Sequence, residues 1–318
     1  MTASETTTAP ARAPWLRDDA LLTVEGLHCA FKTASGRVHA VRGVTFDVRP
    51  GETLGLVGES GCGKTTTGRA ILRLPAGQAG TVTFRGTDMS RLSHGDLRSA
   101  RRKLQMIFQD PLSSFNPRRK VVDIVEEGLA IQRFPRGERR ARVAEVLQQV
   151  GMSTEMVGDR RPHEFSGGQC QRISIARALA PGPELIVCDE PVASLDVSVQ
   201  ARVLNVLQDI RARNDLSLVF VSHDLAVVKV ISDRIAVMNR GRIVEIGDAA
   251  DVYDSPAHPY TQRLLDAVPV VDDSERRDAG DRAVTVDDWE TVDRAMVEVG
   301  PGHYAALGEI VHDGEDVP

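Results

Sequence analysis

The hydrophobic pattern divides the chain into short apolar runs and longer stretches with helical spacing. Four runs are almost wholly apolar, as expected of parallel strands that are covered on both faces. They are residues 52–57, 104–108, 185–188 and 216–221. Other segments alternate apolar and polar positions, which predicts half-buried antiparallel strands. They are residues 21–24, 38–48 with a break at Gly43 and a preceding turn at 34–36, 80–86, and a hairpin over 234–247.

Apolar positions three and four residues apart predict helices over residues 66–74, 121–150 and 166–179, with an interruption of the second at 135–137. Pro111 biases Asp110 away from helical backbone, so a loop is expected there. Buried strands that alternate with helices predict an α/β fold. The antiparallel strands come before its core, and an all-helical insertion interrupts it.

A glycine-rich sequence lies between the strand at 52–57 and the helix that follows. Its spacing is Gly58, four residues, then Gly63, Lys64 and Thr65. Glycines let backbone N–H groups turn toward an anion, and a helix start adds unpaired donors and a positive dipole end. The sequence therefore predicts a phosphate cradle, in which Lys64 reaches the β- and γ-phosphates and Thr65 ligates Mg²⁺. A glycine-rich turn before an ordinary helix is the alternative.

Composition limits the class of protein. The chain has 318 residues, of which 42% are hydrophobic and 26% charged, so about two globular domains are expected. It contains no run of 18 apolar residues, and its first 14 residues lack the order of a signal peptide. We therefore expect a cytosolic chain that does not itself cross a membrane. The four cysteines form no C-x-x-C pair, so neither a zinc site nor an iron–sulphur cluster is indicated.

The negative charge is concentrated near the C-terminus. Residues 271–318 carry 14 Asp and Glu against 4 Arg, so the 39 basic and 45 acidic residues of the chain leave 35 and 31 before position 271. We expect this tail to be a solvated, partly ordered appendage, and residues 1–18 to be disordered. No basic stripe with interleaved aromatic residues indicates a nucleic-acid partner.

A second glycine turn opens the helix that runs to residue 179. Its residues, Ser166, Gly167, Gly168 and Gln169, are placed to bind a second anion at the helix start. A plain helix cap explains them equally well. Phe31 also has two interpretations, because an aromatic ring there either stacks on an adenine or packs in the core or within the first hairpin.

Polar residues follow two of the buried strands. Asp189 and Glu190 come after the strand at 185–188, and His223 comes after the strand at 216–221. Ligands bind at the carboxyl ends of parallel strands. Asp189 is therefore placed to bind in the coordination shell of Mg²⁺, and Glu190 is placed to contact an attacking water. His223 lies at the same edge and is expected to face the ligand rather than the core.

The order of these motifs resembles the ATP-binding subunit of an ABC transporter. The residues that carry the resemblance are 58–65, Gln109, 166–169, 189–190, 194–196 and His223. The resemblance implies a P-loop NTPase with a RecA-like core, an N-terminal antiparallel β subdomain and an inserted α-helical subdomain. The implied ATPase domain spans residues 19–250, and its helical subdomain spans about 110–178.

The resemblance also implies a role for each matching residue. The implied nucleotide-binding residues are Phe31, Gly58, Ser60, Gly61, Cys62, Gly63, Lys64, Thr65, Thr66, Ser166, Gly167, Gly168 and Gln169. Of these, Ser166, Gly167 and Gly168 match the signature that contacts the ATP held by an opposite subunit. The implied Mg²⁺ ligands are Thr65, Gln109 and Asp189. The implied catalytic residues are Glu190 as general base, His223 as the γ-phosphate switch, Gln109 as sensor of water and metal, and Lys64.

Three further segments are similar to the dipeptide and oligopeptide importer branch, namely residues 68–74, 108–118 and 255–261. Within that branch, Gly68, Arg69 and the Asn-Pro-Arg-Arg run at 116–119 resemble the second of two unlike ATPase subunits. The resemblance implies an ATPase that powers di- or oligopeptide import, with nickel or another small solute as the alternative. Residues 251–318 are then an importer-type extension with an acidic tail, which resembles nothing from about 272 onward.

The implied partners are two transmembrane permease subunits, a second homologous ATPase subunit in a heterodimer or homodimer, and indirectly an extracytoplasmic solute-binding protein. The implied location is peripheral, on the cytoplasmic face of the cell membrane. A DNA-repair or chromosome-organising ATPase would need a long coiled coil between Gln109 and Ser166, which lie 57 positions apart. A translation factor would carry two cassettes, and a regulatory cassette usually lacks Lys64 or Glu190.

Overall fold

The computed structural model describes residues 12–33, 36–74, 77–267 and 294–309. Its strands are β1 (Leu22–Thr33), β2 (Gly36–Val48), β3 (Thr53–Val57), β4 (Gln78–Phe84), β5 (Thr87–Asp88), β6 (Leu104–Ile107), β7 (Leu185–Asp189), β8 (Ser217–Ser222), β9 (Arg234–Asn239), β10 (Arg242–Asp248), β11 (Val297–Gly300) and β12 (His303–Ala305). Its α-helices are α1 (Lys64–Ile71), α2 (His94–Lys103), α3 (Pro111–Ser114), α4 (Val121–Ile131), α5 (Arg136–Gln149), α6 (Thr154–Val157), α7 (Gly167–Leu179), α8 (Val197–Asn214), α9 (Leu225–Ile231), α10 (Ala249–Asp254) and α11 (Pro259–Asp266).

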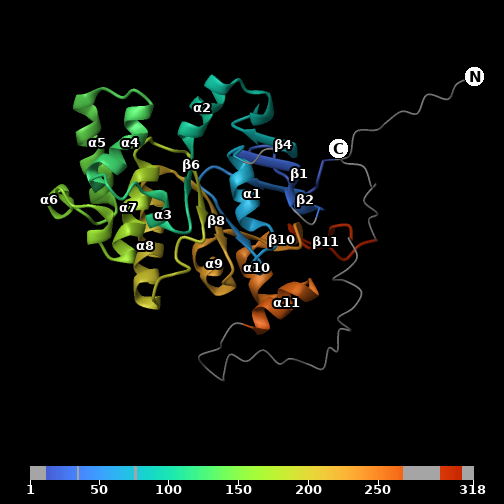
Figure 1. The fold of residues 1–318 in the computed structure, drawn as a ribbon. Helices are drawn as coiled ribbons and strands as arrows, with labels where there is room; N and C mark the ends of the chain where they lie inside the picture. The colour runs from blue at the N-terminus through green and yellow to red at the C-terminus, as the bar shows by residue number, and fades with distance from the viewer. Residues whose placement is uncertain (1–11, 34–35, 75–76, 268–293, 310–318) are drawn as a thin grey trace, which may run out of the picture.

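Two sheets organise these elements (Figure 1). The larger has the order β11-β12-β10-β9-β3-β8-β7-β6, and its central strands β9, β3, β8, β7 and β6 are parallel. The smaller sheet, β2-β1-β4-β5, is antiparallel. The predicted α/β fold with a separate antiparallel sheet is therefore confirmed.

The parallel strands are buried on both faces, as their apolar runs predict. On β7 and β8, Ile186 and Phe220 belong to the core shared with the helices, whereas Val187 and Val221 belong to the core shared with the antiparallel sheet. Successive side chains of a strand point to opposite faces, so one apolar run contributes to both cores. This burial holds the carboxyl ends of β3, β7 and β8 side by side at one edge.

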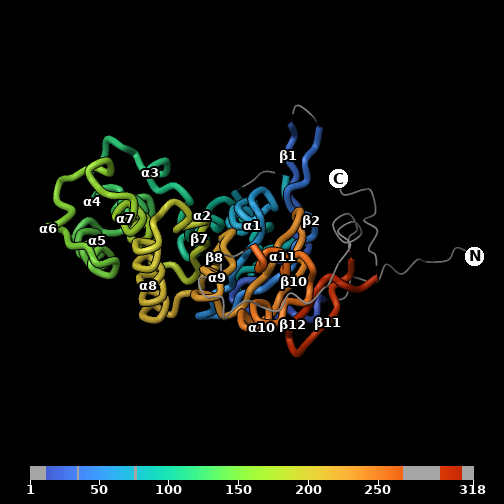
Figure 2. Tube along the Cα trace, turned by 90° about the horizontal axis from the view of Figure 1, so that it is seen from below, coloured from blue at the N-terminus to red at the C-terminus, as the bar shows by residue number. Residues whose placement is uncertain are grey.

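Helices α3 to α7 form a group at one side of the molecule, and the β1–β2 hairpin projects from the opposite side (Figure 2). Asp110 keeps extended backbone, as Pro111 predicts, but its side chain accepts a bond from the Leu112 N–H and so starts helix α3. Pro135 precedes the first residue of α5, so the interruption lies at 132–135 rather than 135–137. Proline suits this position because the first turn of a helix needs no N–H partner there.

Helix α1 begins at Lys64, two residues before the predicted start, and ends at Ile71 rather than at residue 74. Arg73 has φ 57°, a left-handed conformation that cannot continue a helix. Strand β1 also extends to Thr33, beyond its predicted end at residue 24, because β2 and β4 pair along it through irregular register. Residues 34–35 of the predicted turn lie outside the described residues.

Both chain ends contribute to the packing. Residues 12–18 differ from the expected disordered tail, because the Trp15 indole donates to the Thr45 carbonyl at 3.1 Å and its ring lies 5.4 Å from that of Tyr304. Strands β11 and β12 join the large sheet beside β10, so this part of the acidic tail is ordered, with β12 buried and β11 largely exposed. Residues 1–11, 268–293 and 310–318 lie outside the described residues.

Candidate functional site

The glycine-rich loop between β3 and α1 wraps around its own lysine. Lys64 is 3% exposed, and its ammonium donates to the carbonyl of Gly58 at 2.6 Å and of Glu59 at 2.8 Å. The Cys62 thiol lies 3.8 Å from the same nitrogen. These contacts hold a positive charge at the centre of a loop whose outer residues Glu59 and Ser60 are exposed.

Two glycines of this loop are required by their surroundings. A Cβ on Gly58 would lie 2.1 Å from the Met238 carbonyl oxygen, and one on Gly63 would lie 2.2 Å from the Ala40 carbonyl oxygen. Gly63 precedes α1 with φ 107° and offers no side chain to cap the helix. The first N–H groups of α1 therefore lack a side-chain cap and point out of the helix start, which is the arrangement that binds phosphate.

Asp189 lies at the carboxyl end of β7 and faces the start of α1. Its Oδ1 accepts a 2.8 Å bond from the Thr65 hydroxyl, and burial raises the pKa of the carboxyl, partly opposed by that bond. One carboxylate and one hydroxyl beside a phosphate cradle form an oxygen-only donor set. Such a set fits Mg²⁺, which usually takes one or two protein ligands together with water and substrate phosphates.

Three side chains from separate elements meet at the next position. Gln109 Nε2 donates to Glu190 Oε2 at 2.9 Å, and His223 Nδ1 lies 3.5 Å from the same oxygen. The Glu190 side chain is 12% exposed and that of His223 is 53% exposed. Glu190 has φ 44°, and its N–H donates to the Val221 carbonyl at 3.0 Å. Left-handed backbone in a residue with a side chain costs energy and is common at functional sites.

The second glycine turn forms a helix cap. Ser166 Oγ accepts from the Gln169 N–H, and Gln169 Oε1 accepts from the Ser166 N–H at 2.9 Å, which is a capping box at the start of α7. A Cβ on Gly168 would lie 2.3 Å from Val199 Cγ1, so glycine is required for the contact with α8. Ser166 and Gly167 are exposed, and within the described residues no hydrogen bond joins this turn to the phosphate loop.

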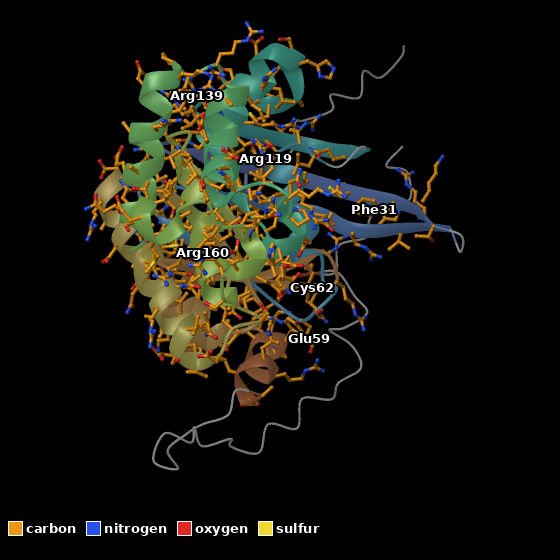
Figure 3. All side chains as sticks on the ribbon, turned by 60° about the vertical axis from the view of Figure 1, so that its left-hand side comes forward. Phe31, Glu59, Cys62, Arg119, Arg139 and Arg160 are labelled. Atoms are coloured by element: carbon orange, nitrogen blue, oxygen red, sulfur yellow. The ribbon has the colours of Figure 1, made fainter. Side chains whose placement is uncertain are left out.

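Phe31 lies on the β1–β2 hairpin, away from the loop that carries Glu59 and Cys62 (Figure 3). It is 41% exposed and pairs with Val38, which is also exposed. An exposed ring on a projecting hairpin is not part of a core, so packing in the core does not explain Phe31.

The sequence reasoning missed one contact of the phosphate loop. The hydroxyl of Tyr260, in α11, accepts a 2.9 Å bond from the backbone N–H of Glu59. The sequence signal for Tyr260 is its place in the segment at 255–261, which indicates a family and no contact. Within the described residues, no helix combines the length and the apolar content that a membrane span needs.

Comparison with known families identifies two regions of the chain. Residues 41–193 match the ABC transporter family, a range that includes the phosphate loop, Gln109, the capping box and the pair Asp189 and Glu190. Residues 244–288 match the oligopeptide/dipeptide transporter C-terminal region, which includes Glu245 and Tyr260.

Curated relatives match nearly the whole chain. The oligopeptide transport ATP-binding protein OppF of Bacillus subtilis (strain 168) is 48% identical over 297 residues, which cover 91% of this chain and 96% of the relative. OppF of Streptococcus mutans is 46% identical, with 91% and 95% covered. The glutathione import ATP-binding protein GsiA of Shigella boydii is also 46% identical, but the match covers 48% of that longer protein.

Solved structures share the fold. CbiO1 of Clostridium perfringens, part of the ABC transporter complex cbiONQ, superposes with a TM-score of 0.67 at 26% identity and covers 75% of this chain and 92% of its own. A dimeric post-hydrolysis state of the ATP-binding cassette MJ0796 bound to ADP and Pi has a TM-score of 0.64 at 26% identity, with 72% and 98% covered.

Proposed function

The chain belongs to the ABC transporter family as an ATP-binding subunit, and from that premise we propose that its ATP hydrolysis powers the import of oligopeptides. One observation carries the proposal. A phosphate loop with a buried lysine, a carboxylate bonded to Thr65, and a second carboxylate held by Gln109 meet at one edge of a parallel sheet. These are the parts that hydrolysis of a nucleoside triphosphate needs.

Each part has a distinct task in the proposed reaction. Lys64 and the uncapped N–H groups of α1 bind the β- and γ-phosphates, and Thr65 and Asp189 would hold Mg²⁺. When bound, the metal neutralises phosphate charge. Glu190 accepts the proton of the attacking water, Gln109 orients its carboxylate, and His223 donates to the γ-phosphate from the same edge.

The capping box at α7 completes the site of a second ATPase subunit. Ser166 and Gly167 are exposed at a helix start, where N–H groups and the dipole favour an anion. Gln169 supports this turn by capping it, and Phe31 stacks on the adenine from the projecting hairpin. The dimeric cassette bound to ADP and Pi supports an arrangement of two subunits.

The partners and the cargo follow from the relatives. Their names specify oligopeptides or glutathione, itself a tripeptide, so a peptide cargo is favoured over nickel. We assign two permease subunits and a second ATPase as partners, a solute-binding protein as an indirect partner, and the cytoplasmic face of the membrane as the location. The domain boundaries that accompany this proposal are an ATPase domain at 19–250 and an importer-type extension at 251–318.

Uptake of a labelled oligopeptide by cells that lack this chain tests the proposal. Expression of the wild-type chain restores uptake, and Lys64→Ala does not, because the phosphates lose their central charge. A matched control is Lys229→Ala, which removes a half-buried lysine whose ammonium pairs with Asp254 rather than with the loop. Restored nickel uptake with unchanged peptide uptake would reject the cargo assignment.

A further inference from the structure

A tyrosine of the C-terminal extension is buried against the phosphate loop. Tyr260 is 1% exposed, although its hydroxyl is polar, and that hydroxyl accepts the 2.9 Å bond from the Glu59 N–H. The two residues are separated by 201 positions. Figure 3 shows Glu59 beside Cys62 on the loop that Tyr260 contacts. None of the steps proposed for hydrolysis uses this contact.

The bond acts on a peptide unit that also holds the catalytic lysine. The Glu59 N–H and the Gly58 carbonyl belong to one planar peptide, and the carbonyl accepts the 2.6 Å bond from Lys64 Nζ. The tyrosine hydroxyl therefore holds one side of this plane, and the ammonium holds the other. A rotation of the peptide that breaks the first bond also displaces the second acceptor.

A buried carboxylate anchors the turn that carries the tyrosine. Glu245 on β10 is fully buried, and it accepts from the Ala257 N–H at 2.8 Å and the His258 N–H at 3.0 Å. His303 Nε2 on β12 lies 2.7 Å from its Oε1. His258 Nδ1 in turn accepts from the Tyr260 N–H at 3.1 Å. The extension thus reaches Glu245 from two sides, through the turn before α11 and through β12.

We propose that Tyr260 is a positioning residue for the phosphate loop, and that Glu245 and His303 fix the turn that places it. The proposal rests on the proposed function, because it assumes that this loop binds ATP. The proposal gives the C-terminal extension a role in shaping the phosphate loop. The extension preorganises the Gly58–Glu59 peptide, so that Lys64 is already in place when the phosphates arrive.

Tyr260→Phe separates positioning from packing, because it removes one hydroxyl and keeps the ring. The Glu59 N–H loses its acceptor, and a lost bond of this kind weakens binding by about tenfold. We expect the Kd for a non-hydrolysable ATP analogue to rise by about that factor. In the nucleotide-free protein, Cys62 should react with N-ethylmaleimide about tenfold faster, since a loosened loop exposes its thiol more often. Peptide mapping by mass spectrometry identifies the modified cysteine.

Tyr304→Phe is the matched control. Tyr304 is also buried and also belongs to the extension, on β12, but it packs against Trp15 rather than the loop. Its substitution should leave both the analogue Kd and the Cys62 rate within twofold of wild type. A lower melting temperature for Tyr260→Phe with both readouts unchanged would overturn the proposal, because the tyrosine would then serve packing alone.

Two further results separate a failure of the proposed function from a failure of the positioning role. If the wild-type chain does not bind the analogue, the proposed function fails. If wild type and Tyr260→Phe bind it with equal Kd, only the positioning role is rejected. If Tyr260→Phe does not fold, hydrogen exchange of the Glu59 amide in the nucleotide-free wild type tests the bond to Tyr260 instead. Protection supports the bond to Tyr260, and exchange at the rate of an unstructured peptide contradicts it.

Discussion

The two glycine-led helix starts differ in what already occupies their N–H groups. At α1, Gly63 supplies no cap, and the buried Lys64 lies in the loop. At α7, Ser166 and Gln169 form a capping box, and the turn is exposed. The first start is uncapped and has the buried Lys64 ammonium beside it, whereas the second is capped by its own side chains. We propose that the same local signal serves a complete phosphate site in one place and half of a site in the other.

The two helix starts differ because they are packed against different elements. Helix α1 lies between the two sheets, next to β7 and β8, so polar strand ends converge on its start. Helix α7 packs against α4 and α5 of the helical group and against α8, and the residues around its start face solvent. A polar strand edge completes the first site from within the chain. In the proposed function, the second site is completed by groups from another subunit.

Glu190→Gln gives the largest expected effect and tests the completeness of the first site. The amide keeps the shape of the side chain but cannot accept a proton, so turnover should fall by about 10²- to 10⁴-fold. ATP affinity should stay within about twofold, since Lys64 and the α1 donors are intact. Steady-state hydrolysis and equilibrium binding measure the two quantities. Unchanged turnover would reject Glu190 as the base.

Ser166→Arg tests whether the second start acts on a partner's nucleotide. The bulky side chain also removes the cap, so turnover should fall by about 10²-fold, the effect of losing a positioned donor. Binding of ATP at the chain's own loop should not change. Wild-type specific activity should also rise with protein concentration, because the site forms between two subunits.

Ser153→Arg is the control for this substitution. Ser153 is an exposed N-cap of α6 in the same helical group, and its side chain accepts from the Met156 N–H. Loss of that cap should cost about 1 kcal/mol of stability without a matching loss of turnover. A wild-type rate independent of protein concentration would contradict the two-subunit interpretation.

Asp189→Asn should raise the stability of the nucleotide-free protein while it abolishes Mg²⁺-dependent hydrolysis. Burial raises the pKa of Asp189 above its ordinary value of 3.8, so the ionised carboxylate opposes folding. Below pH 3.8 both proteins carry a neutral group and should unfold alike. As the pH rises past that value the wild type loses stability relative to the variant, because only the wild type must bury a charged carboxylate.

Denaturant unfolding at several pH values measures this difference, and Asp196→Asn is its control. Hydrogen bonds from the Val199 N–H and the Ser198 hydroxyl lower the pKa of the exposed Asp196, which caps α8. Its ionised form therefore favours folding, and removing its charge should not stabilise the protein at neutral pH. Equal gains for the two variants would refute the assigned cause.

Cys62→Ser should have the smallest effect, less than about twofold on ATP affinity, because the loop uses backbone N–H groups rather than this thiol. Burial raises the pKa of the Cys62 thiol, and the positive charge of Lys64 partly offsets this rise. Because the thiolate is the reactive form, alkylation should become faster as the pH rises. Alkylation should block ATP binding, and ATP should protect the thiol. If a chain alkylated at Cys62 binds ATP normally, the loop is misassigned.

The phosphate loop and the buried strands could be predicted because their signals are local. Gly58, Gly63 and Lys64 are close in sequence. An apolar run by itself indicates that the strand it forms is buried. Asp189 and His223 could also be found, because parallel strands place their carboxyl ends at one edge. The helix boundaries at Lys64 and at Pro135 were shifted, since caps depend on backbone conformations such as that of Gly63.

Contacts made by the C-terminal extension could not be predicted in the same way. The bond between Tyr260 and Glu59, and that between His303 and Glu245, join segments 201 and 58 positions apart. No hydrophobic periodicity or motif spacing in the sequence marks either pair, because each contact depends on where the extension folds back across β10. The sequence by itself determined which chemical groups the candidate site can offer. The tertiary structure alone decided which distant groups hold its loop, because only the packed sheet brings them within bonding distance.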